Sequence, residues 1–155
     1  MLTNSDYTFT LSVSTGNYAC KPSKEEMHKI AFVPFQLTIE SALQCANQGK
    51  AFCYTFKSKN NDGYLPIKQK KVENFVSTST VIYDFDDMEV NMTDYISQIP
   101  FKPSFAYPTY SDGKNGLARF RLAYVFDKDI QGEEDFDEIY HAIANANQFV
   151  KETKE

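Results

Sequence analysis

The sequence predicts an α+β domain with a mixed or antiparallel central sheet flanked by helices. Three observations lead to this class. Polar and apolar residues alternate in several short segments rich in β-branched and aromatic side chains, which is typical of half-buried strands. Helix-capping residues precede segments rich in helix formers. Finally, Asp-Gly and Asn-Gly dipeptides within residues 112–116 separate two strand-like segments and predict a hairpin.

The first half of the chain is expected to contain two strands and two helices. Residues 7–14 alternate in polarity and predict a strand. A short helix is expected from Ser23, with Pro34 marking its limit, because proline disfavours helix in the residue before it. A second helix is expected after Thr38, whose hydroxyl suits an N-cap. Residues 51–56 then predict a strand.

The second half predicts three strands and two helices. The most regular strand is 78–85, which is β-branched and bounded by charge. A short helix is expected over 91–99, capped by Asn91 or Thr93. The predicted hairpin joins strands 105–110 and 119–126, and residues 133–150 follow as an amphipathic helix with acidic residues in its first turn.

Length and composition fit a single domain over residues 1–155. Hydrophobic residues make up 42% and charged residues 24%, which excludes a disordered or fibrous chain. There are 3 cysteines, without metal-ligand spacing, so neither a disulfide framework nor a zinc site is expected. No membrane-length apolar run and no secretory leader pattern is visible. We therefore expect a cytoplasmic protein with no membrane partner.

Charge is distributed unevenly along the chain. The net charge is −5, yet the first half is net positive and the second half is net negative. Lysines cluster in one stretch, at Lys57, Lys59, Lys68, Lys70 and Lys71. This stretch is either a solvated loop or a local contact for a phosphate chain.

The strongest candidate for chemistry is the segment Asp84-Phe85-Asp86. Residues i and i+2 of a strand share a face, so Asp84 and Asp86 are expected to project together toward a cleft. Two adjacent carboxylates repel unless a cation lies between them, and Mg²⁺ prefers one or two carboxylates together with substrate phosphates. Such sites carry phosphoryl or nucleotidyl transfer. The alternative is a strand that simply runs into an acidic loop.

A second pair, Arg119 and Arg121, has the same spacing on another predicted strand. Arginine recognises phosphate bidentately, so this pair would hold a triphosphate if its strand lay beside Asp84 and Asp86. The alternative is that the arginines neutralise the two aspartates directly. No P-loop, dinucleotide-binding, zinc-protease or serine-hydrolase motif occurs. His28 and His141 are expected to be surface residues.

The order of several segments resembles a known family. A helix ending in QGKAF is followed by KQKKVENF, by STSTVIYDFDD, by FAYPTYSDGKNGLARFRLAYVFDKDI and by an amphipathic helix. This order is similar to the N-terminal catalytic region of archaeo-eukaryotic primase-like proteins. It is most similar to the primase-polymerases and replication proteins of bacterial plasmids, phages and integrated elements. The resemblance covers roughly residues 36–150, and it implies a primase-like core related to the RNA-recognition fold.

The resemblance implies roles for individual residues. Asp84 and Asp86 would be the catalytic aspartates and would bind Mg²⁺ or Mn²⁺. Nucleotide phosphates would lie at Arg119, Arg121 and Ser111, and nucleic acid at Lys68, Lys70 and Lys71. The implied partners are a single-stranded DNA template, nucleoside triphosphates and a helicase or another replication protein. Two alternatives stay open: a non-catalytic primase-like module that binds nucleic acid or a replication partner, and a protein whose acidic half docks a basic partner.

The chain also departs from the family pattern. The S-x-H histidine is missing, because no histidine occurs between His28 and His141. No third metal-binding acid is identified, although Asp127 and Asp129 are available as substitutes. These two departures are compatible with a fragment of a longer protein, with a split subunit and with an inactive relative. We expect the isolated chain to bind nucleotide or single-stranded DNA weakly and to have little or no catalytic activity.

Overall fold

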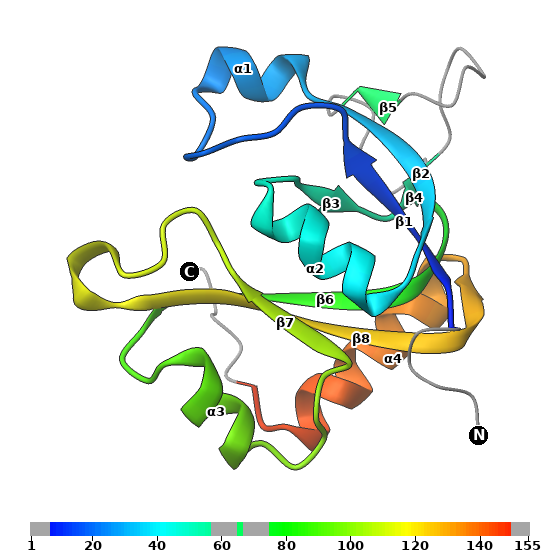
Figure 1. Cartoon of the computed structure of the whole chain (residues 1–155). Helices are drawn as coiled ribbons and strands as arrows, with labels where there is room; N and C mark the ends of the chain where they lie inside the picture. The colour runs from blue at the N-terminus through cyan, green and yellow to red at the C-terminus, as the bar shows by residue number, and fades with distance from the viewer. Residues whose placement is uncertain (1–6, 57–64, 67–74, 150–155) are drawn as a thin grey trace.

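A computed structural model describes residues 7–56, 65–66 and 75–149, and it has an α+β architecture (Figure 1). The strands within these residues are β1 (Phe9–Ser14), β2 (Ala31–Leu37), β3 (Phe52–Cys53), β4 (Thr55–Phe56), β5 (Leu65–Pro66), β6 (Phe75–Met88), β7 (Phe105–Pro108) and β8 (Ala118–Gln131). The helices are α1 (Lys24–Lys29), α2 (Ile39–Asn47), α3 (Met92–Gln98) and α4 (Glu133–Ala146). None of these helices is long and apolar enough to span a membrane.

The strands form two antiparallel sheets instead of one central sheet. Sheet A has the order β3-β1-β2-β5, and sheet B has the order β4-β6-β8-β7. The predicted strand 51–56 is divided between the two sheets, because the chain crosses from β3 to β4 at Tyr54. The Tyr54 hydroxyl accepts a hydrogen bond from the Ile82 amide of β6 at 3.0 Å, which anchors this crossing to sheet B. The α+β class is confirmed, and the single central sheet is wrong.

Capping side chains begin three of the helices at the predicted residues. Ser23 and Thr38 each accept a hydrogen bond from the amide three residues later, and Asn91 does the same for Asp94. Such caps satisfy amides that have no partner within the helix. By contrast, Pro34 does not mark a helix limit. It lies inside β2, opposite Ser12 of β1, and the described residues of β5 pair with Ala31 and Phe32. Proline is tolerated at a position where no described strand needs its missing amide proton.

Sheet B lies in the middle of the molecule (Figure 1). Sheet A and α2 cover one face, where a core includes Leu11 of β1, Ala42 of α2 and Ala123 of β8. Helices α3 and α4 cover the opposite face, where a second core includes Leu122 of β8 and Ile143 of α4. Neighbouring residues of β8 therefore serve different cores, as the alternation of a strand requires.

Candidate functional site

Three polar side chains lie in one row across sheet B, on the face that carries sheet A and α2. Arg121 of β8 is directly opposite Asp84 of β6 and Tyr107 of β7. Its guanidinium donates two hydrogen bonds to Asp84, from Nε to Oδ1 at 3.2 Å and from Nη2 to Oδ2 at 3.1 Å. This fork-to-carboxylate geometry gives specificity as well as attraction. The strand of Arg121 therefore lies beside the strand of Asp84, which is the condition that the sequence set for a shared face.

The neighbouring row on the same face is apolar. Ala123 lies opposite Ile82 and Phe105, and all three belong to the core shared with sheet A. The sheet thus changes from an apolar to a charged surface over a single step of two residues. The surface becomes charged beside the C-terminal end of α2. The charged row therefore lies at the edge of the area that α2 and sheet A cover, and not inside it.

A bulge displaces the carboxylates that follow Asp84. Phe85 pairs with Phe120, but the next paired residue of β6 is Met88, opposite Ala118. The strand therefore has one extra residue here, and Asp87 adopts a left-handed backbone with φ of 54°. Aspartate tolerates this conformation better than most residues.

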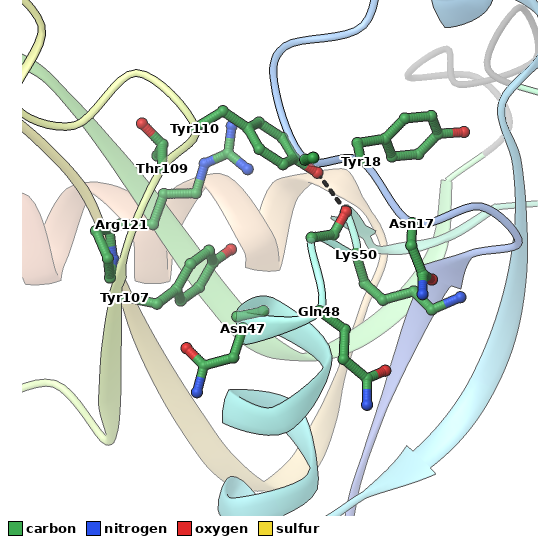
Figure 2. Close-up of a pocket in the computed structure, with 13 residues that line it drawn as sticks. Asn17, Tyr18, Asn47, Gln48, Lys50, Tyr107, Thr109, Tyr110 and Arg121 are labelled. Carbon is green, nitrogen blue, oxygen red and sulfur yellow. Dashed lines mark hydrogen bonds between the residues drawn. The ribbon is translucent and has the colours of Figure 1, made fainter.

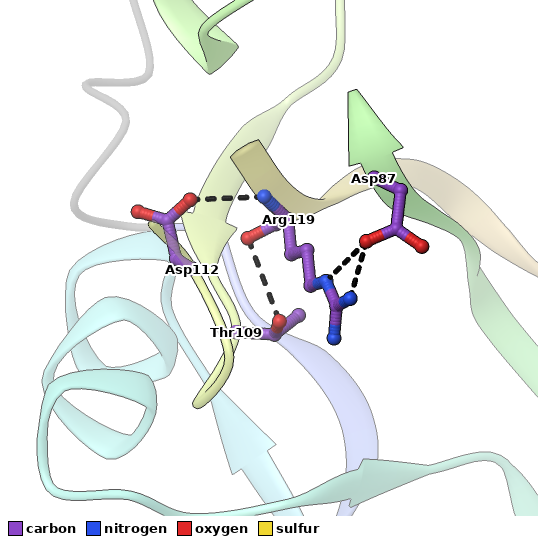
Figure 3. A network of polar contacts seen from close by, with 4 residues as sticks. All are labelled: Asp87, Thr109, Asp112 and Arg119. Atoms are coloured by element: carbon purple, nitrogen blue, oxygen red, sulfur yellow. Dashed lines mark hydrogen bonds and ion pairs between the residues drawn. The ribbon is translucent and has the colours of Figure 1, made fainter. Parts of the chain in front are cut away.

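The bulge selects Asp87, instead of Asp86, as the partner of Arg119 (Figure 3). The Arg119 guanidinium donates to Asp87 Oδ1 through Nε at 2.9 Å and also through Nη2. The Arg119 amide donates to Asp112 Oδ1 at 2.9 Å, which ties the hairpin loop to β8. Asp86 is exposed, and its carboxylate has no hydrogen bond or ion pair with the described part of the chain. The sequence left open the alternative that the two arginines neutralise the aspartates directly. The structure shows such ion pairs, with Asp87 in the place of Asp86.

A cavity of about 500 Å³ adjoins the row formed by Asp84, Arg121 and Tyr107 (Figure 2). Its walls come from the loop after β1, the end of α2, and strands β7 and β8. The polar and aromatic side chains in these walls include Asn47, Gln48, Lys50, Tyr107, Tyr110 and Arg121. Two cations line the cavity: Lys50, which donates to the Ser14 carbonyl at 3.2 Å, and Arg121, which extends from sheet B (Figure 2).

The wall at the end of α2 is held by close backbone contacts. The Gly49 carbonyl accepts hydrogen bonds from the Tyr18 amide at 2.9 Å and from the Tyr110 hydroxyl at 2.6 Å. Gly49 has a φ of +78°, and a Cβ atom at this position would lie 2.0 Å from the Tyr18 carbonyl oxygen. Only glycine fits both constraints, so the cavity wall depends on this residue.

Tyr107 places a shielded hydroxyl next to Arg121. The residue is 6% exposed, and its hydroxyl proton has no acceptor among the described residues. Burial raises the pKa of Tyr107, and the nearby Arg121 charge only partly opposes this effect. Burial alone would lower the pKa of Arg121, but the hydrogen bond to Asp84 raises it above its usual value. Both groups therefore remain proton donors at neutral pH.

A divalent metal would find two carboxylates here, at Asp84 and Asp86. Within residues 7–56, 65–66 and 75–149, no group of three or more His, Cys, Asp or Glu side chains is placed to hold a metal. Asp86 is unpaired, while both oxygens of Asp84 are bound by Arg121. Mg²⁺ keeps several of its own waters and takes further ligands from substrate phosphates, so one or two protein carboxylates would suffice for it. To bind a metal, Asp84 would have to give up its two hydrogen bonds with Arg121.

Asp127 and Asp129 lie too far along β8 to complete this pair. Asp127 and Asp129 fall in the irregular part of β8 between Val125, opposite Thr80, and Ile130, opposite Thr78, whereas Arg121 lies opposite Asp84. Both acids line a second hollow of about 410 Å³ together with Asp135 and Glu138 of α4. They therefore belong to the opposite end of the ladder between β6 and β8.

The structure brings together only part of the predicted site. Asp84 and Arg121 meet, Arg119 binds Asp87, and Ser111 lies in the hairpin turn, where its carbonyl accepts from the Lys114 amide. The predicted nucleic-acid contacts lie outside the described residues; they are Lys68, Lys70 and Lys71.

Sequence reasoning missed Tyr107 and the cavity beside it. The signal was available in the hairpin, because its pairing places Tyr107 directly opposite Arg121. The side chains contributed by α2 have no comparable signal, because their position depends on how sheet A packs on sheet B. Comparisons of this chain with family models, curated proteins and solved structures found no match.

Proposed function

We propose that this chain is a metal-dependent nucleotidyltransferase domain of the primase-polymerase type, acting in the replication of a mobile element. The observation that carries the proposal is the row of Asp84, Arg121 and Tyr107 beside a cavity of about 500 Å³. A carboxylate and two proton donors on one face suit a nucleotide whose phosphates bring a metal. The segment order that resembles primase-like proteins supports the same reading, including a primase-like core.

Each residue of the site has a distinct part in this function. Arg121 binds and orients the nucleotide phosphates, and in doing so it releases the Asp84 carboxylate. Asp84 and Asp86 would hold Mg²⁺ or Mn²⁺, and that ion would neutralise charge that develops on the phosphates. Arg119 positions the end of β6 through Asp87 instead of contacting phosphate. Template binding would fall to the lysine-rich stretch that includes Lys70 and Lys71.

A second candidate is a non-catalytic module that binds nucleotide or nucleic acid through the same face. The observation in its favour is that both arginines are neutralised by aspartates, while no third acid accompanies Asp84 and Asp86 in the described part. A two-metal reaction generally requires more carboxylate ligands than these. This module would bind without extending a primer.

Calorimetric titration with a nucleoside triphosphate, with and without Mn²⁺, tests the metal site. We expect Mn²⁺ to tighten nucleotide binding in the native chain and not in Asp86→Asn, because the unpaired carboxylate is lost. Asp87→Asn is the matched control, since Asp87 is one residue away and is bound to Arg119. An equal response to Mn²⁺ in all three proteins would refute the metal site.

A primer-synthesis assay separates the two candidates. The purified chain is given Mn²⁺, a single-stranded DNA template and all nucleoside triphosphates. Primer synthesis that is lost in Asp84→Asn supports the nucleotidyltransferase. Binding of nucleotide or of the single-stranded template without any synthesis supports the binding module, and binding of neither rejects both candidates.

A further inference from the structure

We propose that the cavity beside Arg121 is a nucleotide subsite in which the base lies on the Tyr110 ring while a phosphate lies between Arg121 and Tyr107. This inference rests on the proposed function and deepens it, because it assigns recognition of the base to residues of α2 and of the hairpin. The volume of about 500 Å³ lies within the usual range for small-molecule pockets.

The first argument concerns a buried hydroxyl whose proton lacks an acceptor. The Tyr107 hydroxyl is shielded from solvent, and its proton has no acceptor in the part of the chain that is described. Its charged neighbour is Arg121, and a guanidinium has donors but no acceptor. Two donors that converge without a shared acceptor suit an oxyanion, which accepts hydrogen bonds from both. A phosphate oxygen at this point would satisfy the hydroxyl and draw the guanidinium away from Asp84.

The second argument concerns the aromatic surface. Tyr110 is 38% exposed, and its hydroxyl is tied to the Gly49 carbonyl, so the ring bridges the hairpin and the end of α2 (Figure 2). A ring fixed at its far end loses little conformational freedom when a ligand stacks on it. Stacking on an aromatic ring accepts any base, because every base has a flat face.

The third argument concerns orientation. Helix α2 presents its C-terminal end to the cavity, and this end carries partial negative charge. A phosphate is therefore disfavoured there, whereas a neutral base with amino groups is not. The amide side chains of Asn47 and Gln48 are exposed at this end, and neither forms a hydrogen bond with another described residue. Amides of this kind can pair with a base edge through one donor and one acceptor.

Calorimetry in EDTA tests the subsite without any contribution from a metal. The probes are the four nucleoside triphosphates and inorganic triphosphate, which has no base. We expect at least one nucleotide to bind more tightly than inorganic triphosphate. Tyr110→Ala should weaken that nucleotide roughly ten-fold, because base stacking is lost, and leave inorganic triphosphate unchanged. Tyr110→Phe keeps the ring and should retain most of the affinity.

Two further variants act as checks. Phe35→Ala removes an aromatic side chain that is 50% exposed on β2, outside the cavity, and should not affect either probe. Asn47→Ala should change the ranking of the four nucleotides, since it removes an amide from the base edge. A thermal melt of every variant establishes that it is folded.

The outcomes separate this inference from the proposed function. If inorganic triphosphate binds as tightly as every nucleotide, and Tyr110→Ala has no effect on any probe, the base subsite is wrong while phosphate binding at Arg121 stands. If no probe binds the native chain in EDTA or with Mn²⁺, the proposed function fails and the subsite fails with it.

Discussion

The two ends of the ladder between β6 and β8 both carry clustered acidic side chains, but they differ in what faces those acids. At one end Arg121 and Arg119 contact Asp84 and Asp87, and a cavity with few charged groups lies beside them. At the other end β8 and α4 contribute acids to one hollow, where the lining includes a single lysine; the acids are Asp127, Asp129, Asp135 and Glu138.

This difference shows why an acidic cluster alone is a poor guide to a site. Carboxylates at the hollow repel one another, and no ion pair among the described residues relieves them. Such an arrangement is tolerated on a surface because water screens the charges. At the arginine end Asp84 and Asp87 are each paired with one arginine, and a phosphate can replace a carboxylate in such a pair.

Removing the cation at the arginine end should have the largest effect on binding. Arg121→Gln deletes the charge that faces Asp84 and the cavity, so we expect affinity for a nucleoside triphosphate to fall by roughly 10- to 100-fold, as charge-assisted hydrogen bonds are lost. Calorimetry measures the change. Lys128→Gln removes the same charge at the acidic end and should leave binding nearly unaltered. Equal losses in both variants would mean that binding depends on net charge alone.

A change in the cavity wall should affect stability. Gly49→Ala places a Cβ atom 2.0 Å from the Tyr18 carbonyl oxygen, at a φ of +78°. We expect the free energy of unfolding to fall by more than about 1 kcal/mol, because neither the backbone conformation nor the contact tolerates a side chain. Urea denaturation measures this. Gly113→Ala is a matched control for the backbone term, since Gly113 has a φ of +76° and open space around it. Similar losses in the two variants would show that the contact with Tyr18 contributes nothing.

The smallest effect is expected at the acidic end. Burial raises the pKa of Tyr7, and the charges of Asp127 and Asp129 add to this rise. Asp129→Asn should therefore lower the Tyr7 pKa slightly, which NMR of ring-labelled tyrosine can follow. A raised pKa in the folded state contributes stability below about pH 10 that is lost as pH rises further. The variant should lose less stability above pH 10 than the native chain. An unchanged Tyr7 titration would show that the acids do not act on it.

Local signals in the sequence were sufficient for most of the secondary structure. Ser23, Thr38 and Asn91 cap their helices through side chains that reach an amide only three residues away. Turn residues near 112–116 predicted the hairpin that joins β7 and β8, and this hairpin is confirmed. Each of these features depends on residues that are close in sequence, so each is readable without knowing the fold.

The partners of the site were decided by tertiary structure. The pairing of β6 with β8 is regular from Thr80 to Phe85, and a bulge then makes Asp87 the partner of Arg119 in place of Asp86. One extra residue in a strand changes which side chain faces its neighbour, and nothing in the local sequence specifies where that residue is accommodated. The cavity likewise required α2 to end beside Tyr107. Residues from four separate segments meet there only because sheet A packs on sheet B through a shared core.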